Sequence, residues 1–166
     1  MKQTPDTSPF VFSPSILLAH WQGHRRLTRK LIAAFPEDQL FKFSIGGMRP
    51  AGEMMIELLT MAGPGIKGIA TGEWPTYQEA AALFPGPCSR QQLLQWWDEG
   101  TEQINSWWPR VAASRWQETD KAFGAYEGPV YWSLQYFIDN EIHHRGQCFV
   151  YLRALGIEPP AFWDRS

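Results

Sequence analysis

Residues 139–160, DNEIHHRGQCFVYLRALGIEPP, decide the fold class of this 166-residue chain. They lie in the longest apolar run with helical spacing, which opens at Pro129, where the missing N–H of proline is harmless in a first helical turn. Gly156 is the residue type that commonly ends a helix, and Pro159 and Pro160 prevent its continuation. The stretch therefore predicts one long helix near the end of the chain.

This helix carries polar side chains although it must also bury an apolar face. Side chains four or three apart stack on one helical face, which predicts a continuous polar stripe of Tyr136, Asn140, His144, Gln147 and Tyr151. Buried polar groups require partners. Asn140 and His144 have the i, i+4 spacing with which a helix offers two ligands to one metal ion, but a neutral amide binds zinc or nickel weakly. His143 is adjacent and turned about a quarter circle away.

Two further helices have clear ends. Ser15 is a candidate cap for the first, which stops before Pro36. Ser89 caps another, which continues to about residue 113 and which Pro109 bends or shortens. Both carry apolar residues at helical spacing, so both are expected to bury one face.

A helix from residue 49 to about 61 is expected between these two. Pro50 lies near its first turn, and Gly63 and Pro64 either end it or mark a kink within a longer helix. The segment that follows is rich in Gly and Pro, with one short helical piece at 78–83, and residues 114–129 are interpreted as a loop.

Four helices, long connections and almost no alternating β-pattern predict an all-α four-helix bundle. Its length suits a single domain, expected over residues 14–166, and residues 1–13 are expected to form an extended arm. The net charge of −2 is spread evenly, which argues against a nucleic-acid partner. Two distant cysteines, no apolar start and no apolar window of about 18 residues indicate a cytoplasmic protein without a membrane partner.

The motif HHRGQ at 143–147, followed by YLRALGIEPP at 151–160, resembles the signature of the last helix in the DinB/YfiT-like superfamily. The resemblance extends from the first helix to the end of the chain. It implies a DinB-like four-helix bundle, commonly a homodimer, and in many members a divalent metal held by three histidines from the second and last helices. The corresponding positions here are Glu57, Asn140 and His144, so one histidine of the three is present.

The resemblance implies a metal-dependent enzyme, a thiol-dependent S-transferase or isomerase. Its cofactors would be a weakly held Zn, Ni, Mn or Fe ion and a low-molecular-weight thiol, which the ion activates. A substrate pocket would then be shaped by Tyr136, His143, Gln147 and Tyr151.

Two alternatives remain open for this site. In one, Glu57 accepts a hydrogen bond from His144 or Asn140 and satisfies both without an ion. In the other, the protein is a metal-free helical dimer that binds a small molecule or a protein partner.

Other residues favour structural roles. His20 and His24 also stand four apart, but their basic flanks disfavour a cation and predict a solvated surface. Arg145 is expected to support the fold, with a clamp for a substrate anion as the alternative. Gly146 predicts a close helix crossing at that turn, and Cys148 a small core residue.

Overall fold

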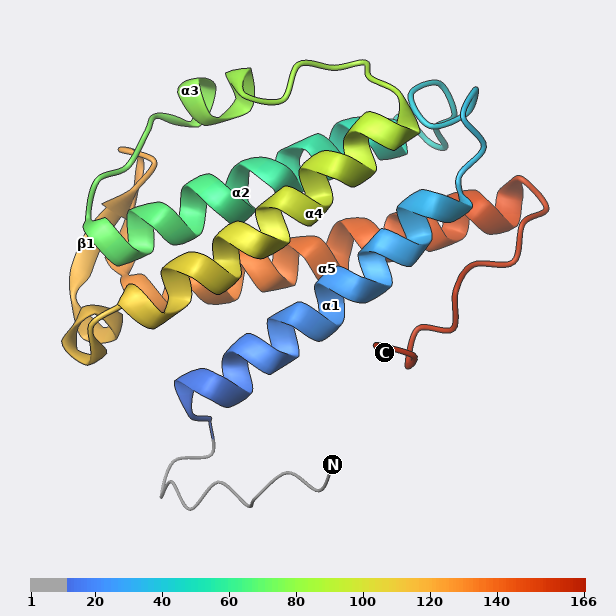
Figure 1. The fold of residues 1–166 in the computed structure, drawn as a ribbon. Coiled ribbons are helices and arrows are strands. Elements are labelled where there is room, and N and C mark those ends of the chain that lie inside the picture. The colour runs from blue at the N-terminus through green and yellow to red at the C-terminus, as the bar shows by residue number, and fades with distance from the viewer. Residues whose placement is uncertain (1–11) are drawn as a thin grey trace.

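The computed structural model describes residues 12–166, and it is a four-helix bundle with long connections (Figure 1), as the sequence predicts. The expected arm at 1–13 lies almost entirely outside the described residues. The main helices are α1 (Pro14–Ala34), α2 (Ala51–Thr71), α4 (Arg90–Trp107) and α5 (Val130–Ala154). The connections contain α3 (Tyr77–Ala82), the 3-10 turns η1 (Trp108–Arg110) and η2 (Ala113–Gln117), and the strands β1 (Thr119–Ala122) and β2 (Tyr126–Pro129).

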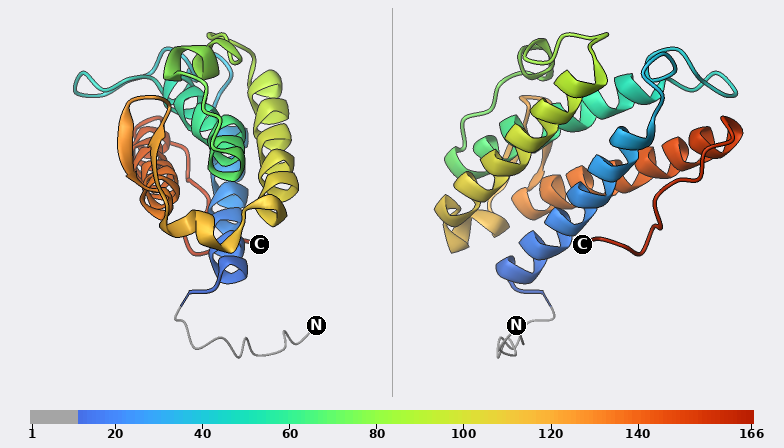
Figure 2. Two further views of the ribbon diagram at one scale, coloured as in Figure 1. Left: turned by 90° about the vertical axis from the view of Figure 1, so that its left-hand side faces the viewer. Right: turned by 45° about the vertical axis from the view of Figure 1, so that its right-hand side comes forward.

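The helices are arranged so that α1 and α2 each pack against both α4 and α5. α1 and α2 therefore lie diagonally across the bundle, and α5 forms one outer side of it (Figure 2). The long α2–α4 connection, with α3, runs over α2 (Figure 1). The hairpin closes the end of the bundle at which α5 begins.

The helix ends follow local signals. Ser13, rather than Ser15, caps α1, because its side chain accepts from the Ile16 N–H at 3.3 Å. Ser89 caps α4 as predicted. α2 continues through Pro64 to Thr71, so the longer of the two alternatives is the one that occurs.

Close packing against α2 depends on its glycines. A Cβ atom on Gly65 would lie 2.7 Å from the Phe137 ring, and one on Gly68 would overlap the Trp74 ring. Gly146 has no heavy atom within 4 Å of its Cβ position in the described chain, so the crossing predicted there is wrong within this chain.

The hairpin corrects the prediction of a loop at 114–129. β1 and β2 pair antiparallel, with Thr119 opposite Pro129 and Ala122 opposite Tyr126. Its turn places Phe123 at φ 53° and Gly124 at φ 69°. Each strand has four residues, too few for an alternating pattern to stand out, and the hairpin is stabilised by packing of Phe123 against Phe137.

The core consists of two apolar clusters separated by a polar layer. One cluster, around Trp21, Ile66 and Phe137, fills the hairpin end, and the other, around Leu31, Met55 and Trp97, fills the opposite end. The buried polar and charged residues have positions between them along the helices: His24, Arg25, Thr28, Thr60, Asn140, Glu141, His144 and Arg145. The polar groups of the last helix thus belong to a layer shared by the whole bundle.

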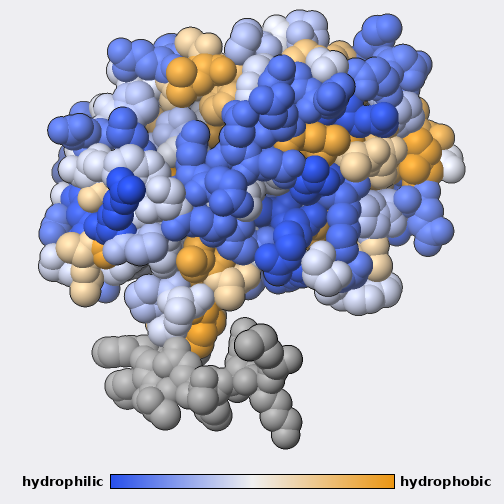
Figure 3. Space-filling model, in the orientation of Figure 1, coloured by the Kyte–Doolittle hydropathy of each residue, from blue (hydrophilic) through white to orange (hydrophobic). Residues whose placement is uncertain are grey.

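The surface seen in Figure 3 is mostly hydrophilic, with small separate apolar areas. Within residues 12–166, no helix is both long enough and apolar enough to cross a bilayer.

Candidate functional site

One half of the polar layer joins α2 to α5 around the carboxylate of Glu57. Asn140 donates to Glu57 Oε1 at 2.9 Å, and His144 Nε2 lies 3.3 Å from the same oxygen. Arg49, just before α2, forms a salt bridge with the other carboxylate oxygen. Its guanidinium also lies 3.4 Å from His144 Nε2. The structure therefore brings together Glu57, Asn140 and His144, the residues at the metal position expected from the resemblance. It also places the Arg49 guanidinium against both Glu57 and His144.

The electrostatics of this cluster favour an ionised Glu57. Burial alone would raise the pKa of Glu57, but hydrogen bonds with His144, Asn140 and Arg49 outweigh it and lower that pKa to about 2. Such a carboxylate is a weak base near neutral pH. The Glu57 carboxylate is therefore suited to remain as a fixed negative charge and is not suited to abstract a proton as a general base.

Gln147 and Tyr151 hold the segment that carries Arg49. The Tyr151 hydroxyl donates to the Arg49 carbonyl at 3.0 Å, and the Gln147 amide contacts the Met48 sulfur at 3.3 Å. Gln147 also accepts from His144 Nδ1 at 2.8 Å. These side chains of α5 therefore set the position of both Arg49 and the His144 ring.

The donor set fits a divalent ion poorly. Both ring nitrogens of His144 already have partners: Nδ1 donates to Gln147, and Nε2 lies 3.3 Å from Glu57 Oε1 and 3.4 Å from the Arg49 guanidinium. Glu57 is paired with the same cation. Within residues 12–166, no group of three or more His, Cys, Asp or Glu side chains is placed to hold a metal. A divalent ion would have to displace Arg49 and would gain one carboxylate, one imidazole and a weak amide ligand.

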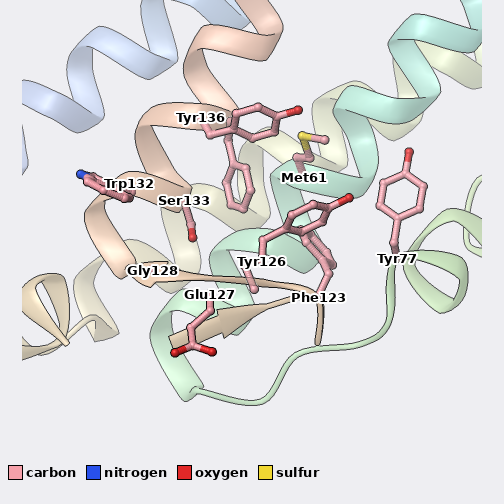
Figure 4. Close-up of a pocket in the computed structure, with 11 residues that line it drawn as sticks. Met61, Tyr77, Phe123, Tyr126, Glu127, Gly128, Trp132, Ser133 and Tyr136 are labelled. Carbon is pink, nitrogen blue, oxygen red and sulfur yellow. The ribbon is translucent and has the colours of Figure 1, made fainter. Parts of the chain in front are cut away.

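A largely apolar pocket of about 270 Å³ lies beside this cluster, between the hairpin and the start of α5. Figure 4 shows Tyr126 and Tyr136 gathered near Met61, whereas the Glu127 carboxylate points away from them. The residues that line the pocket are Met61, Tyr77, Ala122, Phe123, Tyr126, Glu127, Gly128, Trp132, Ser133, Tyr136 and Phe137.

The pocket and the Glu57 cluster are neighbours. Met61 lines the pocket and receives a 3.4 Å contact from the Asn140 amide. Tyr77 lines both the pocket and a neighbouring, more open depression whose wall includes Arg49 and Glu57. Burial and the charge of Glu57 raise the pKa of Tyr77, and the same two causes act in the same direction on Tyr136. Both hydroxyls therefore stay protonated and able to donate near neutral pH.

The polar stripe expected on α5 is divided in the structure. Tyr136 lines the pocket, His144 and Asn140 join the Glu57 cluster, and Tyr151 is fully buried. His143 is exposed and does not line the pocket. Sequence reasoning missed Arg49, Tyr77 and the hairpin side chains, because only tertiary packing brings these segments to α5.

The family model described as "DinB family" matches residues 7–165. The chain belongs to the DinB family.

Solved DinB-like structures agree with this fold. YjoA of Bacillus subtilis is 19% identical, has a TM-score of 0.69, and is matched over 90% of this chain and 99% of its own. A DinB-like protein from Bacillus cereus ATCC 10987 is 19% identical, with a TM-score of 0.68 and coverage of 90% and 97%. A protein assigned to the DinB family from Exiguobacterium sibiricum 255-15 is 24% identical, with a TM-score of 0.67 and coverage of 92% and 97%. At these identities the likeness establishes the fold alone. No curated protein matches the sequence significantly.

The other half of the polar layer in this DinB-family chain joins α1 to α5. Arg145 donates to His24 Nδ1 at 2.7 Å and to Thr28 at 3.1 Å, so it supports the fold as expected. His24 is 2% exposed, and its Nε2 lies 3.1 Å from Nε2 of exposed His20. The prediction of a solvated surface is therefore wrong for His24, because its turn of α1 faces α5.

Stability is expected to depend on pH through His24. Burial and the Arg145 charge lower the pKa of His24 to about 3, so the unfolded chain takes up a proton near pH 6.5 and the folded chain does not. The contribution of uncharged His24 to the free energy of unfolding is fully present above pH 6.5 and is lost as pH falls toward 3. His24→Gln should reduce the loss of unfolding free energy between pH 7 and 5 by about 2 kcal/mol in urea titrations.

His143→Gln, which removes an exposed imidazole from α5, is the control for that variant. An unchanged pH dependence in His24→Gln would contradict the assignment.

Cys148 is a core residue, as predicted. It is fully buried, and burial raises the pKa of its thiol to about 12, which disfavours the reactive thiolate. Burial also raises the pKa of Cys88, the other cysteine.

Proposed function

We propose that this DinB-family protein binds a small, uncharged, largely apolar molecule in the pocket between the hairpin and α5, without a resident metal. The observation that carries the proposal is the aromatic pocket itself, which lies beside an ion-paired Glu57. Ligand sites are typically apolar cavities with a few polar groups that fix orientation.

The size of the pocket limits the ligand. A volume of about 270 Å³ lies just below the range of about 300–1,000 Å³ for small-molecule sites. Aromatic walls from Phe123, Phe137 and Trp132 favour a flat, apolar body. The ligand is therefore expected to be about the size of a substituted naphthalene.

The polar groups of the pocket favour a hydrogen-bond acceptor on the ligand. Tyr77 and Tyr136 keep their protons near neutral pH and can donate to a carbonyl, ether or hydroxyl oxygen. The negative charge of Glu57 nearby disfavours an anionic ligand. The Arg49 guanidinium is already paired with Glu57, so it is not free to bind an anion. A neutral ketone or similar molecule fits this environment best.

The thiol-dependent S-transferase remains a prediction that this geometry does not favour. That chemistry relies on an ion to stabilise a thiolate, and the Arg49 guanidinium faces both Glu57 and His144.

Low metal content would support the proposal: protein purified without an affinity tag should hold less than about a tenth of an equivalent of any divalent metal. About one equivalent of a single metal, lost in His144→Ala, would contradict it.

Binding is tested with prodan, a neutral naphthyl ketone whose emission shifts to the blue in apolar sites. We expect a dissociation constant on the order of 100 µM, from about −0.3 kcal/mol per non-hydrogen atom. Ser133→Trp should abolish the shift because the added ring fills the pocket that Ser133 lines. Gln135→Trp adds the same ring to an exposed position of α5 and is the matched control.

Tyr136→Phe removes only a hydroxyl and should weaken prodan binding about fivefold, the effect of one neutral hydrogen bond. The anionic probe anilinonaphthalenesulfonate should bind more weakly than prodan. Equal prodan binding by wild type and Ser133→Trp would contradict the proposed site.

A further inference from the structure

We infer that the hydroxyl groups of Tyr126 and Tyr136 together bind one carbonyl oxygen, so that the ligand class of the pocket is the conjugated ketones, an inference that rests on the proposed function. Tyr126 begins β2, and Tyr136 lies near the second turn of α5. The two donors therefore come from the two walls that the hairpin and α5 contribute to the pocket.

The two hydroxyl groups point to the same side of the pocket. Figure 4 shows both hydroxyl oxygens directed toward the side on which Met61 lies. The electrostatics agree with this arrangement, because Tyr126 adds to the rise in the pKa of Tyr136 that burial and the Glu57 charge cause. A ligand atom beside Met61 can therefore approach both donors.

Both hydroxyl groups are available to a ligand. Neither makes a hydrogen bond within residues 12–166, and Tyr126 and Tyr136 are 67% and 57% exposed. The hydroxyl of Tyr77, the third tyrosine of the pocket, is shared with Thr60, whose own proton goes to the Glu57 carbonyl at 2.6 Å. Tyr126 and Tyr136 are thus the pocket tyrosines without an acceptor in the described part of the chain.

Two O–H donors that meet at one point favour a carbonyl oxygen. Such an oxygen has two lone pairs and a single substituent, so it can accept both hydrogen bonds without crowding. An ether oxygen has two substituents, which leave room for one donor. Conjugation with a flat ring places more negative charge on the carbonyl oxygen, and the ring itself suits the aromatic walls of the pocket.

A cationic ligand is the main alternative, because hydroxyl oxygens and aromatic rings also attract an ammonium group. The Glu127 carboxylate points away from the two tyrosines, and the Glu57 carboxylate is paired with Arg49. A neutral acceptor is therefore favoured over a cation.

The emission of prodan tests the carbonyl contact, since hydrogen bonds to its carbonyl oxygen shift the emission to the red. Wild type should give a smaller blue shift than Tyr126→Phe or Tyr136→Phe, because in each variant the carbonyl loses one donor. Tyr131→Phe changes a tyrosine of α5 that does not line the pocket, and it should match wild type. The emission of bound prodan is extrapolated from protein titrations, so that differences in affinity do not contribute.

A pair of simpler ligands tests the number of donors by nuclear magnetic resonance titration. Wild type should bind 2-acetylnaphthalene about fivefold more tightly than 2-methoxynaphthalene, the effect of one additional neutral hydrogen bond. The ratio of the two dissociation constants should fall to about one in Tyr126→Phe and in Tyr136→Phe, and it should stay at about five in Tyr131→Phe. The cation 2-naphthylmethylammonium should bind more weakly than the ketone.

The possible results separate the carbonyl contact from the pocket itself. Bound prodan with the same emission in wild type and in both pocket variants would overturn the inference and leave the proposed function standing. Tighter binding of the ammonium than of the ketone would also overturn it. Absence of prodan binding to wild type would remove the proposed function and the carbonyl contact together.

Discussion

Replacing Glu141 with leucine is expected to lower the free energy of unfolding by about 3–5 kcal/mol, the usual effect of removing one partner from a buried ion network. Glu141 and Arg25 are 2% and 1% exposed, and Arg145 is 6% exposed. Glu141 lies within 3.9 Å of Arg25 and 3.8 Å of Arg145. The leucine variant would leave two guanidinium groups in the bundle without their only buried carboxylate among the described residues.

The local bonding explains why this network is sensitive. Burial raises the pKa of Glu141, and the two arginines and Thr28, which donates to Glu141 at 2.6 Å, oppose that rise. Arg25 also donates to the Trp97 carbonyl at 2.8 Å and stacks on the Trp97 ring at 3.8 Å. Part of the arginine network would therefore survive in the variant, but its charge would be uncompensated.

Two controls separate charge imbalance from loss of packing. The triple variant Arg25→Met/Glu141→Leu/Arg145→Met removes all three charges and should recover most of the lost stability in urea unfolding. Asp98→Ala breaks the exposed Arg29–Asp98 pair, whose side chains are about half exposed, and should cost less than about 1 kcal/mol. A Glu141→Leu effect as small as that of Asp98→Ala would show that the network adds little.

Glu57→Gln is expected to lower stability at pH 7 by about 2 kcal/mol, and this difference should vanish in acid. Lowering the pKa of Glu57 from 4.5 to about 2 corresponds to about 3 kcal/mol, which solvent screening of half-exposed Arg49 reduces. Because the folded pKa is depressed, the stabilisation is fully present above pH 4.5 and is lost as pH falls toward 2. Urea titrations of both proteins between pH 7 and 2 measure the gap.

Glu53→Gln is the matched control, since Glu53 is an exposed residue one turn earlier in α2. Its effect should stay within about 0.5 kcal/mol at pH 7. A Glu57→Gln deficit that does not change with pH would mean that Glu57 acts through shape or neutral hydrogen bonds and not through its charge.

Local signals were sufficient for the main helices. Pro129, Gly156 and Ser89 act on their immediate neighbours through backbone geometry and capping, so the start of α4 and both ends of α5 could be predicted within a few residues. The end of α4 was predicted at about residue 113, but the helix stops at Trp107, before Pro109. The likeness of HHRGQ at 143–147 to the DinB signature likewise led to the family that the family model confirms.

The burial of charge on α1 was harder to predict. His24, Arg25 and Thr28 stand in a segment with many basic residues, and composition alone favoured a solvated face. Their spacing from Trp21 is helical, however, and all four residues are buried. The periodicity was therefore present in the sequence, but the carboxylate that compensates the buried charge of Arg25 lies more than a hundred residues away, at Glu141.

The sequence by itself determined the all-α class, the four long helices and the position of Asn140 and His144 on one turn of the last helix, because these depend on contacts between residues near in the chain. Only the tertiary structure placed Arg49 against Glu57, formed the hairpin wall of the aromatic pocket and left Gly146 open to solvent. Those features depend on which segments meet across the bundle, and that is decided by the packing of all four helices together.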